Sequence, residues 1–228
     1  MRIIDITGKI VDGMWNYDNP FPMFRLKPIG DMPWLPNKVY SHIFEGMHSQ
    51  SGTYLETPAH YYGFKKSYTV ADIPVSKLID MPCRVLSLEG FTAEGTNRKK
   101  RIDVHDLEKC CAGYDFPSGV SILIATGWSD YWMEDCFVQE SPFFTYDAMH
   151  WIISKKPILL GSDFPCWDNS ENTQGFFDDF FKSDILMLAP CVNLRQAGRC
   201  DSLLTVMPIN VMGTSNAPCR AFLKTEQS

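Results

Sequence analysis

The stretch Gln50-Ser51-Gly52-Thr53-Tyr54-Leu55-Glu56-Thr57-Pro58-Ala59-His60 decides how this chain is understood. Side chains that can bind or transfer protons recur in it around a Gly-Thr pair, at positions 50, 54, 56 and 60. A glycine in such a turn lets the backbone come close to a bound group. The preceding segment, 38–47, alternates in part between two faces, which predicts a strand that leads into the motif. We therefore place the candidate site at residues 50–60.

Strand-like and helix-like segments alternate through the rest of the chain. Asp103 and Thr145 are candidate N-caps of two of the helices. The β-branched runs predict strands at 3–6, 82–88, 120–125, 157–161, 185–188 and 203–211, the last being one long strand or a pair, and the apolar periodicity predicts helices at 103–111, 145–155 and 176–182. This alternation predicts an α/β protein. With 228 residues and no internal repeat or linker, the simplest organisation is one domain over residues 1–228.

The segment from Trp15 to Pro36 is the main irregular part. It holds five prolines, each of which removes a backbone hydrogen-bond donor, so it is predicted to be a loop. Its aromatic residues are Trp15, Tyr17, Phe21, Phe24 and Trp34. They suit a pocket lining, a subunit interface or a lid packed on the core. We take Trp15 and Tyr17 as candidate substrate-binding residues.

Composition excludes several classes of function. The formal charge of -6 disfavours binding to nucleic acid, whose phosphates need clustered positive charge. No apolar run approaches the ~20 residues that span a bilayer, and the first residues do not read as a signal peptide. We expect no membrane partner and a cytoplasmic location. The eight cysteines form no Cys-x-x-Cys pair, so we expect reduced core residues rather than a zinc site.

The motif resembles His-x-Gly-Thr-His-x-Asp-x-Pro-x-His, the signature of the cyclase family of metal-dependent hydrolases, which includes bacterial kynurenine formamidases and isatin hydrolases. Gly52, Thr53, Pro58 and His60 match it. Further matches extend over almost the whole chain, at Asp5-Ile6-Thr7, Gly13-Met14, Thr126-Gly127-Trp128, Gly161-Ser162-Asp163 with Asp168, Asn193-Leu194, Pro208, Gly213 and 217–221. The resemblance implies a swivelling β/β/α-type fold with a mixed sheet and flanking helices. It also implies a homodimer or higher homo-oligomer with the pocket near an interface.

The same resemblance implies metal-assisted hydrolysis of a small cyclic or N-formyl amide or lactone. In the family a divalent cation activates water and the last His transfers a proton. Here Gln50, Tyr54 and Glu56 replace His, His and Asp, and the later ligand positions align near Phe177 and Ala189. No His follows His150, so the later His ligand is missing in any alignment register. We therefore predict that the metal site is lost and expect no cofactor.

One alternative is a single Zn, Mn or Mg ion held by Glu56, Gln50 and His60. A hard cation at Glu56, Gln50 and Asp163 is a variant of it. Without a metal, Glu56 and His60 are the candidate acid–base pair, and Tyr54 or Gln50 would polarise a carbonyl. Phe177 and Asp163 complete the candidate substrate-binding set.

Three functions stay open for a small-molecule ligand. The first is a formamidase-like hydrolase acting on a C–N bond. The second is a metal-free acid–base enzyme, such as a cyclase, dehydratase or isomerase. The third is a non-catalytic relative that binds a ligand.

Overall fold

The computed structural model describes residues 1–34, 39–93, 99–111, 116–198 and 201–226. The strands are β1 (Arg2–Asp5), β2 (Arg25–Pro28), β3 (His42–Glu45), β4 (Tyr54–Glu56), β5 (Met81–Ser87), β6 (Arg101–Ile102), β7 (Ser121–Ala125), β8 (Phe143–Phe144), β9 (Leu159–Ser162), β10 (Leu186–Ala189), β11 (Asp201–Pro208) and β12 (Asn216–Thr225). The α-helices are α1 (Ala59–Tyr62), α2 (Val104–Cys111), α3 (Cys136–Gln139), α4 (Tyr146–Ser154) and α5 (Phe177–Lys182). Short 3-10 helices lie at Val70–Asp72, Val75–Lys77, Trp128–Tyr131 and Leu194–Ala197.

Eight strands form one mixed sheet that closes on itself. Its order is β1-β12-β11-β5-β7-β9-β10-β4, and an additional pairing of β12 with β4 completes the ring. The long strand β12 makes the closure, because it pairs with β11 and also with β4. Its last residues pair in addition with β1. Strands β5, β7, β9 and β10 run parallel to one another, as alternating strands and helices require.

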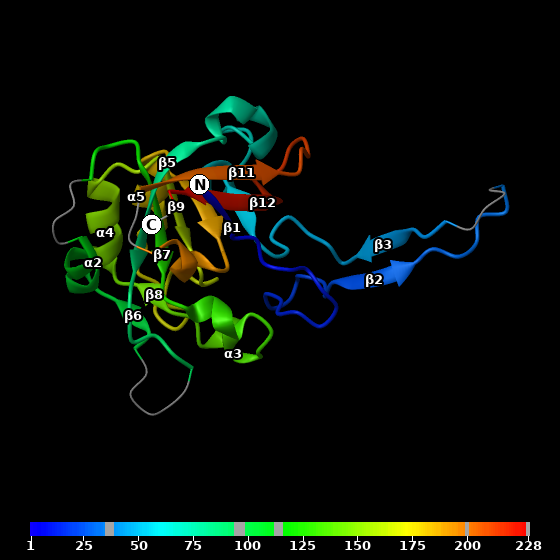
Figure 1. The fold of residues 1–228 in the computed structure, drawn as a ribbon, viewed down its shortest axis with the longest axis horizontal. Helices are drawn as coiled ribbons and strands as arrows, with labels where there is room; N and C mark the ends of the chain where they lie inside the picture. Colours follow the sequence, from blue (N-terminus) through cyan, green and yellow to red (C-terminus); the bar gives the residue numbers. More distant parts are fainter. Residues whose placement is uncertain (35–38, 94–98, 112–115, 199–200, 227–228) are drawn as a thin grey trace.

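Two apolar layers form on the two sides of this sheet. Leu55, Leu123 and Leu188 belong to the cluster inside the ring. Side chains next to them in sequence, such as Ile124 and Met187, point outward into a second cluster, together with residues of α2, α4 and α5. Figure 1 shows α2 and α4 on the side of the body opposite to β2 and β3.

The predicted α/β fold with a mixed sheet and flanking helices is confirmed. Thr145 caps α4 as expected, because its side chain accepts a hydrogen bond from the Ala148 N–H. The segment predicted as a strand or a pair of strands at 203–211 holds one strand, β11, and its partner β12 begins only at Asn216. No disulfide joins two of the cysteines among the described residues, and Cys200 lies outside them. None of the helices in the described ranges has the length and apolar character needed to cross a membrane.

The prediction of an irregular loop over 15–36 is wrong in part. Residues 25–28 form β2, which pairs antiparallel with β3, and the two make a ribbon that stands away from the body in Figure 1. The prolines permit this because Pro28 ends the strand and the others lie outside it. Trp15 packs against Trp132 and Phe137 of the outer core, so only the first part of the segment covers the body.

Candidate functional site

Strand β4 places two motif side chains outside the ring. Leu55 points into the inner core, so its neighbours Tyr54 and Glu56 point to the opposite face of the strand. Glu56 pairs in register with Met187 of β10 on one side and with Asn216 of β12 on the other. The closure of the barrel therefore brings Asn216, 160 positions away in sequence, beside the motif.

The turn before β4 is held by two of the four residues that match the family motif, Gly52 and Thr53. Gly52 has φ of 69°, a left-handed conformation, and an added Cβ would lie 2.7 Å from Ile10 Cγ1. The Thr53 hydroxyl accepts a hydrogen bond from the Gly8 N–H at 2.9 Å and donates to the Pro190 carbonyl at 2.6 Å. These residues therefore fix the loop that carries Gln50 and Tyr54.

A buried carboxylate stands at the centre of the site. Glu56 Oε1 accepts hydrogen bonds from Gln50 Nε2 at 2.9 Å and from Asn216 Nδ2 at 3.2 Å. The same Asn216 amide nitrogen lies 2.9 Å from His60 Nδ1, so it can donate one hydrogen to each partner. In that tautomer His60 carries its proton on Nε2, which is 3.8 Å from Glu56 Oε1. Asn216 therefore aligns the carboxylate and the imidazole.

Burial sets the charge of this cluster. It raises the pKa of Glu56, while the charge of His60 and the hydrogen bonds from Asn216 and Gln50 lower it by less. Burial also raises the pKa of Tyr54 and Tyr17 well above the usual value, and their hydroxyls are 2.7 Å apart. Both phenols are therefore neutral hydrogen-bond donors, and Glu56 accepts protons more readily than an exposed carboxylate does.

These groups open into a cavity of about 440 Å³. Apart from the polar residues above, it is lined by Tyr17, Tyr61, Pro165, Cys166, Trp167, Asp168, Ser170, Phe177, Phe181 and Met187. The rings of Tyr61 and Phe181 are stacked at 6.0 Å, and those of Phe181 and Phe177 are stacked at the same centroid distance. The cavity thus combines one flat aromatic wall with one polar end.

Six of the eight predicted site residues lie together here: Gln50, Tyr54, Glu56, His60, Tyr17 and Phe177. Trp15 does not line the cavity and instead packs edge-on against Tyr17 at 5.3 Å. Asp163 is buried elsewhere, accepting hydrogen bonds from the Thr126 N–H and hydroxyl and from the Gly127 N–H. Burial raises its pKa to about 6, and its carboxylate joins the ends of β7 and β9.

Several residues of the site were missed from the sequence, among them Phe181 of the aromatic wall. Asn216 gives no signal, because only the pairing of β12 with β4 brings it to Glu56. Cys166 and Tyr61 line the cavity, and burial raises the pKa of the Cys166 thiol to about 11. Tyr61 could have been predicted as a site residue, because it directly follows His60 on α1.

The donors at the family's ligand positions do not fit a divalent cation. Gln50 turns its NH2 toward Glu56, and Tyr54 is a neutral phenol hydrogen-bonded to Tyr17. The side chain of Phe177 has no atom that can bind a metal ion, and neither has that of Ala189, the residue of β10 that pairs with Tyr54 of β4. Within the described ranges, no three His, Cys, Asp or Glu side chains are grouped so that they could hold a metal ion. Asp163 is engaged with the backbone and cannot join Glu56.

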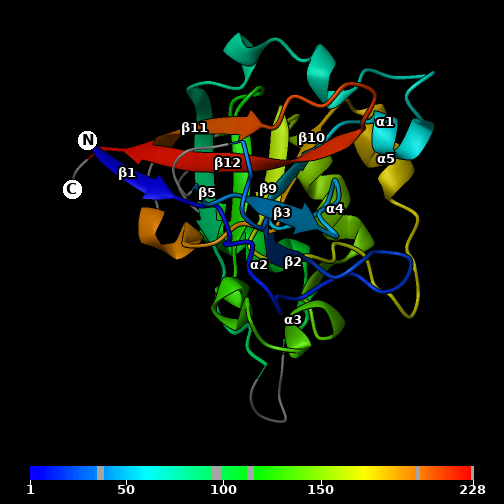
Figure 2. The same ribbon diagram turned by 90° about the vertical axis from the view of Figure 1, so that its right-hand side faces the viewer.

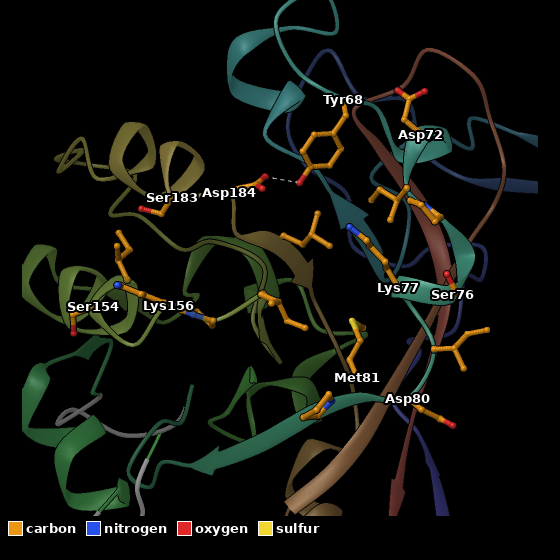
Figure 3. A pocket seen from close by; sticks show the side chains of 18 residues that line it. Tyr68, Asp72, Ser76, Lys77, Asp80, Met81, Ser154, Lys156, Ser183 and Asp184 are labelled. Atoms are coloured by element: carbon orange, nitrogen blue, oxygen red, sulfur yellow. Dashed lines mark hydrogen bonds between the residues drawn. The ribbon is translucent and has the colours of Figure 1, made fainter. Parts of the chain in front are cut away.

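A larger groove, of about 1220 Å³, lies away from the motif. Its lining residues come from within the segments 68–82, 153–158 and 183–186, next to the starts of β5, β9 and β10. Figure 3 shows Lys77 directed into this groove and the Tyr68 hydroxyl donating to Asp184 at 2.7 Å. None of the motif residues belongs to it, so we place the candidate chemistry in the smaller cavity.

Comparison with known proteins identifies the family and the fold of this chain. The model of the family described as "Putative cyclase" matches residues 4–169. An isatin hydrolase bound to the product analogue thioisatinate is 18% identical, with a TM-score of 0.79, over 98% of this chain and 92% of the other. Isatin hydrolase A from Ralstonia solanacearum is 19% identical, with a TM-score of 0.77, over 99% and 92%.

A third solved structure is described as a predicted metal-dependent hydrolase from Bacillus stearothermophilus. It is 22% identical, with a TM-score of 0.74, over 97% of each chain. No curated protein matches this sequence. At these identities the solved structures show a shared fold.

Proposed function

The chain belongs to the cyclase family, and we propose that it is an enzyme that opens a small cyclic or N-formyl amide, or a lactone, by adding water. We propose further that it does so by acid–base catalysis, without a metal ion at the motif. The observation that carries this proposal is the Asn216 amide, which holds Glu56 Oε1 and His60 Nδ1 at the same time. If the side chains here only filled the space of the family's metal ligands, Glu56 and His60 would not need to be aligned by a shared amide.

The cavity supports a flat, ring-bearing substrate. The stacked rings of Tyr61, Phe181 and Phe177 offer a planar apolar wall, and aromatic rings stack best on other planar groups. At the polar end, the paired phenols of Tyr17 and Tyr54 have two hydroxyl hydrogens. One joins the two oxygens, and the other is donated by Tyr17 to the Pro165 carbonyl at 3.3 Å or, with the pair reversed, by Tyr54 to a ligand. That hydrogen of Tyr54 is the candidate donor to a substrate carbonyl oxygen.

The chemistry follows from the tautomer set by Asn216. Ionised Glu56 would take a proton from a water molecule whose oxygen attacks the carbonyl carbon. The protonated Glu56 carboxyl would pass this proton to the leaving nitrogen or oxygen as its bond to that carbon breaks, while the Nε2–H of His60 donates a hydrogen bond that positions the reacting groups. This relay returns Glu56 to its ionised form and leaves the tautomer of His60, whose Nε2 lies 3.8 Å from Glu56 Oε1, unchanged. The net reaction adds one water molecule to the substrate and breaks one carbon–nitrogen or carbon–oxygen bond.

The raised pKa of Glu56 also favours a second candidate. A carboxyl that holds its proton more tightly suits the reverse direction, or a cyclisation, dehydration or isomerisation in which no water must be activated. Incorporation of oxygen-18 from solvent into the product separates the two. Hydrolysis carries the label into the new carboxylate, and isomerisation does not.

The test is turnover of isatin, aryl formamides and aryl lactones by protein purified without a metal-affinity tag. Turnover should persist in chelator and should be lost in His60→Gln and Glu56→Gln. Dependence on added Zn²⁺ or Mn²⁺ would contradict the metal-free mechanism. Saturable binding without turnover would support the non-catalytic relative instead.

A further inference from the structure

We propose that the larger groove, next to the starts of β5, β9 and β10, is a second ligand site that binds a small amphiphilic anion, with one anionic head group on an apolar body. The proposal concerns a site separate from the motif cavity. It does not depend on the reaction proposed above.

Three connections between elements build this groove. The segment between α1 and β5, which runs across one end of the sheet in Figure 2, forms one wall, and the α4–β9 and α5–β10 connections form the other. The Tyr68 hydroxyl of the first wall donates a hydrogen bond to Asp184 of the second, so the two walls are joined. The groove, of about 1220 Å³, shares no lining residue with the motif cavity.

Apolar side chains line both walls of the groove. They are Ile73, Ile79 and Met81 on the first wall and Ile153, Ile158 and Leu186 on the second. Ile79 and Ile158 are 43% and 38% exposed, although both are large and apolar. Exposed apolar surface gathered in a concave site marks a place where another molecule binds. The lining therefore suits the apolar body of a ligand.

Lys77 supplies a positive charge inside the groove. Figure 3 shows its side chain directed into the space between the walls, and Lys156 lies on the opposite wall. Within the ranges that the structure describes, neither lysine forms an ion pair with an acidic side chain. An unpaired ammonium beside apolar surface attracts a ligand that carries one negative charge next to an apolar body.

The three carboxylates of the groove already have partners. Asp80 pairs with Lys224 at 2.6 Å, and its side chain is directed away from the groove in Figure 3. Asp72 accepts hydrogen bonds from the N–H and the hydroxyl of Thr69, at 2.8 Å and 2.7 Å. Asp184 accepts the hydrogen bond that joins the walls. A cationic head group would have to compete with these partners, whereas an anionic one meets an unpaired ammonium.

The experiment is a titration of the full chain, labelled with carbon-13 at its methionine methyl groups, followed by nuclear magnetic resonance. The probes are octanoate, octanol and octylammonium, which share one chain and differ in the charge of the head group. Met81 lines the groove and Met187 lines the motif cavity, and they are 4% and 5% exposed, so each reports on one site. We expect octanoate to shift the Met81 signal saturably and to leave that of Met187 unchanged. Octanol and octylammonium should bind at least about tenfold more weakly, because they lack the charge-assisted hydrogen bond.

The variant Lys77→Met should weaken octanoate binding about tenfold, to the affinity of octanol, and should leave octanol binding unchanged. Lys77→Arg keeps the charge and should retain the preference for octanoate. The matched control is Lys9→Met, which removes an exposed lysine outside the groove and should change neither affinity.

Three results would overturn the proposal. One is an octanoate shift at Met187 with the Met81 signal unmoved. Another is a preference for octanoate that survives Lys77→Met. The third is a Met81 signal that octanoate leaves in place and that a leucine-rich peptide with one aspartate shifts, because the groove would then bind a protein segment instead.

Discussion

Replacing Thr53 by Val tests whether the kept motif residues hold the fold rather than perform chemistry. The substitution keeps the branched shape and removes the hydroxyl. That hydroxyl links two backbone groups from distant segments, the Gly8 N–H and the Pro190 carbonyl, and Thr53 is only 1% exposed. No water can therefore take its place without rearrangement.

The magnitude follows from counting the groups left unpaired. A buried polar group without a partner costs about 1–3 kcal/mol, and two are orphaned here, so the free energy of unfolding should fall by roughly 2–6 kcal/mol. Gly8 cannot easily move to find another acceptor, because an added Cβ there would lie 2.0 Å from the Trp132 ring, which shows how tightly it is packed. The total free energy of unfolding of a domain is roughly 5–15 kcal/mol, so this loss is a large part of it.

The assay is urea unfolding followed by circular dichroism, with Thr53→Ser as the matched control. Serine keeps both hydrogen bonds and loses one methyl group, so it should lose only about 1 kcal/mol. Below the unfolding transition, Thr53→Val should bind aromatic ligands as the wild type does. A loss under about 0.5 kcal/mol, within the range of ordinary surface substitutions, would refute the reasoning, and so would equal losses in the two variants.

Three further predictions concern the cavity. Asn216→Leu should lower kcat by up to about a hundredfold and shift the pH profile, whereas a purely structural role would leave that profile unchanged. Glu56→Gln should stabilise the fold at neutral pH. Burial raises the pKa of Glu56 above its ordinary pKa of 4.5, so protonated Glu56 stabilises the fold at low pH. That stability is lost as the pH rises through the raised pKa, and glutamine, which does not ionise, avoids the loss. Paired urea titrations across that window check this, and a constant difference would contradict it. Cys166, whose pKa of about 11 compares with 9.0 for an unperturbed thiol, should react with iodoacetamide about a hundredfold more slowly than a free cysteine peptide, as peptide mass spectrometry can show.

The strands and helices that were predicted correctly each carry a local signal. The cap at Thr145 and the β-branched run ending at Ala125 depend on neighbouring residues only, and both elements form where expected. Strand β2 was missed for a related reason. Its sequence, Arg25-Leu26-Lys27-Pro28, ends in a proline and has no buried face, so nothing local distinguishes it from a loop.

The site was predictable only where the motif reaches. Residues 50–60 mark the cavity, because their spacing alone places Tyr54 and Glu56 on one face of a strand. Asn216 acquires its role through the pairing of β12 with β4, which no local pattern reveals. Asp163 shows the opposite error: it matches a family segment, but its carboxylate is used by the backbone at Thr126 and Gly127.

The side chains at the replaced motif positions fit one common chemistry once Asn216 is considered with them. A cation beside a carboxylate favours its ionised form and lowers its pKa. Here two neutral amides, from Gln50 and Asn216, hold Glu56 in place through hydrogen bonds, and these lower its pKa by less than burial raises it. In the proposed mechanism this position, where the family motif has Asp, therefore serves as a carboxyl that can take up and release a proton. His60 keeps its family position beside that carboxyl and acquires a fixed tautomer from Asn216. The loss of ligands and the survival of His60 are thus consistent with one change of chemistry at one site.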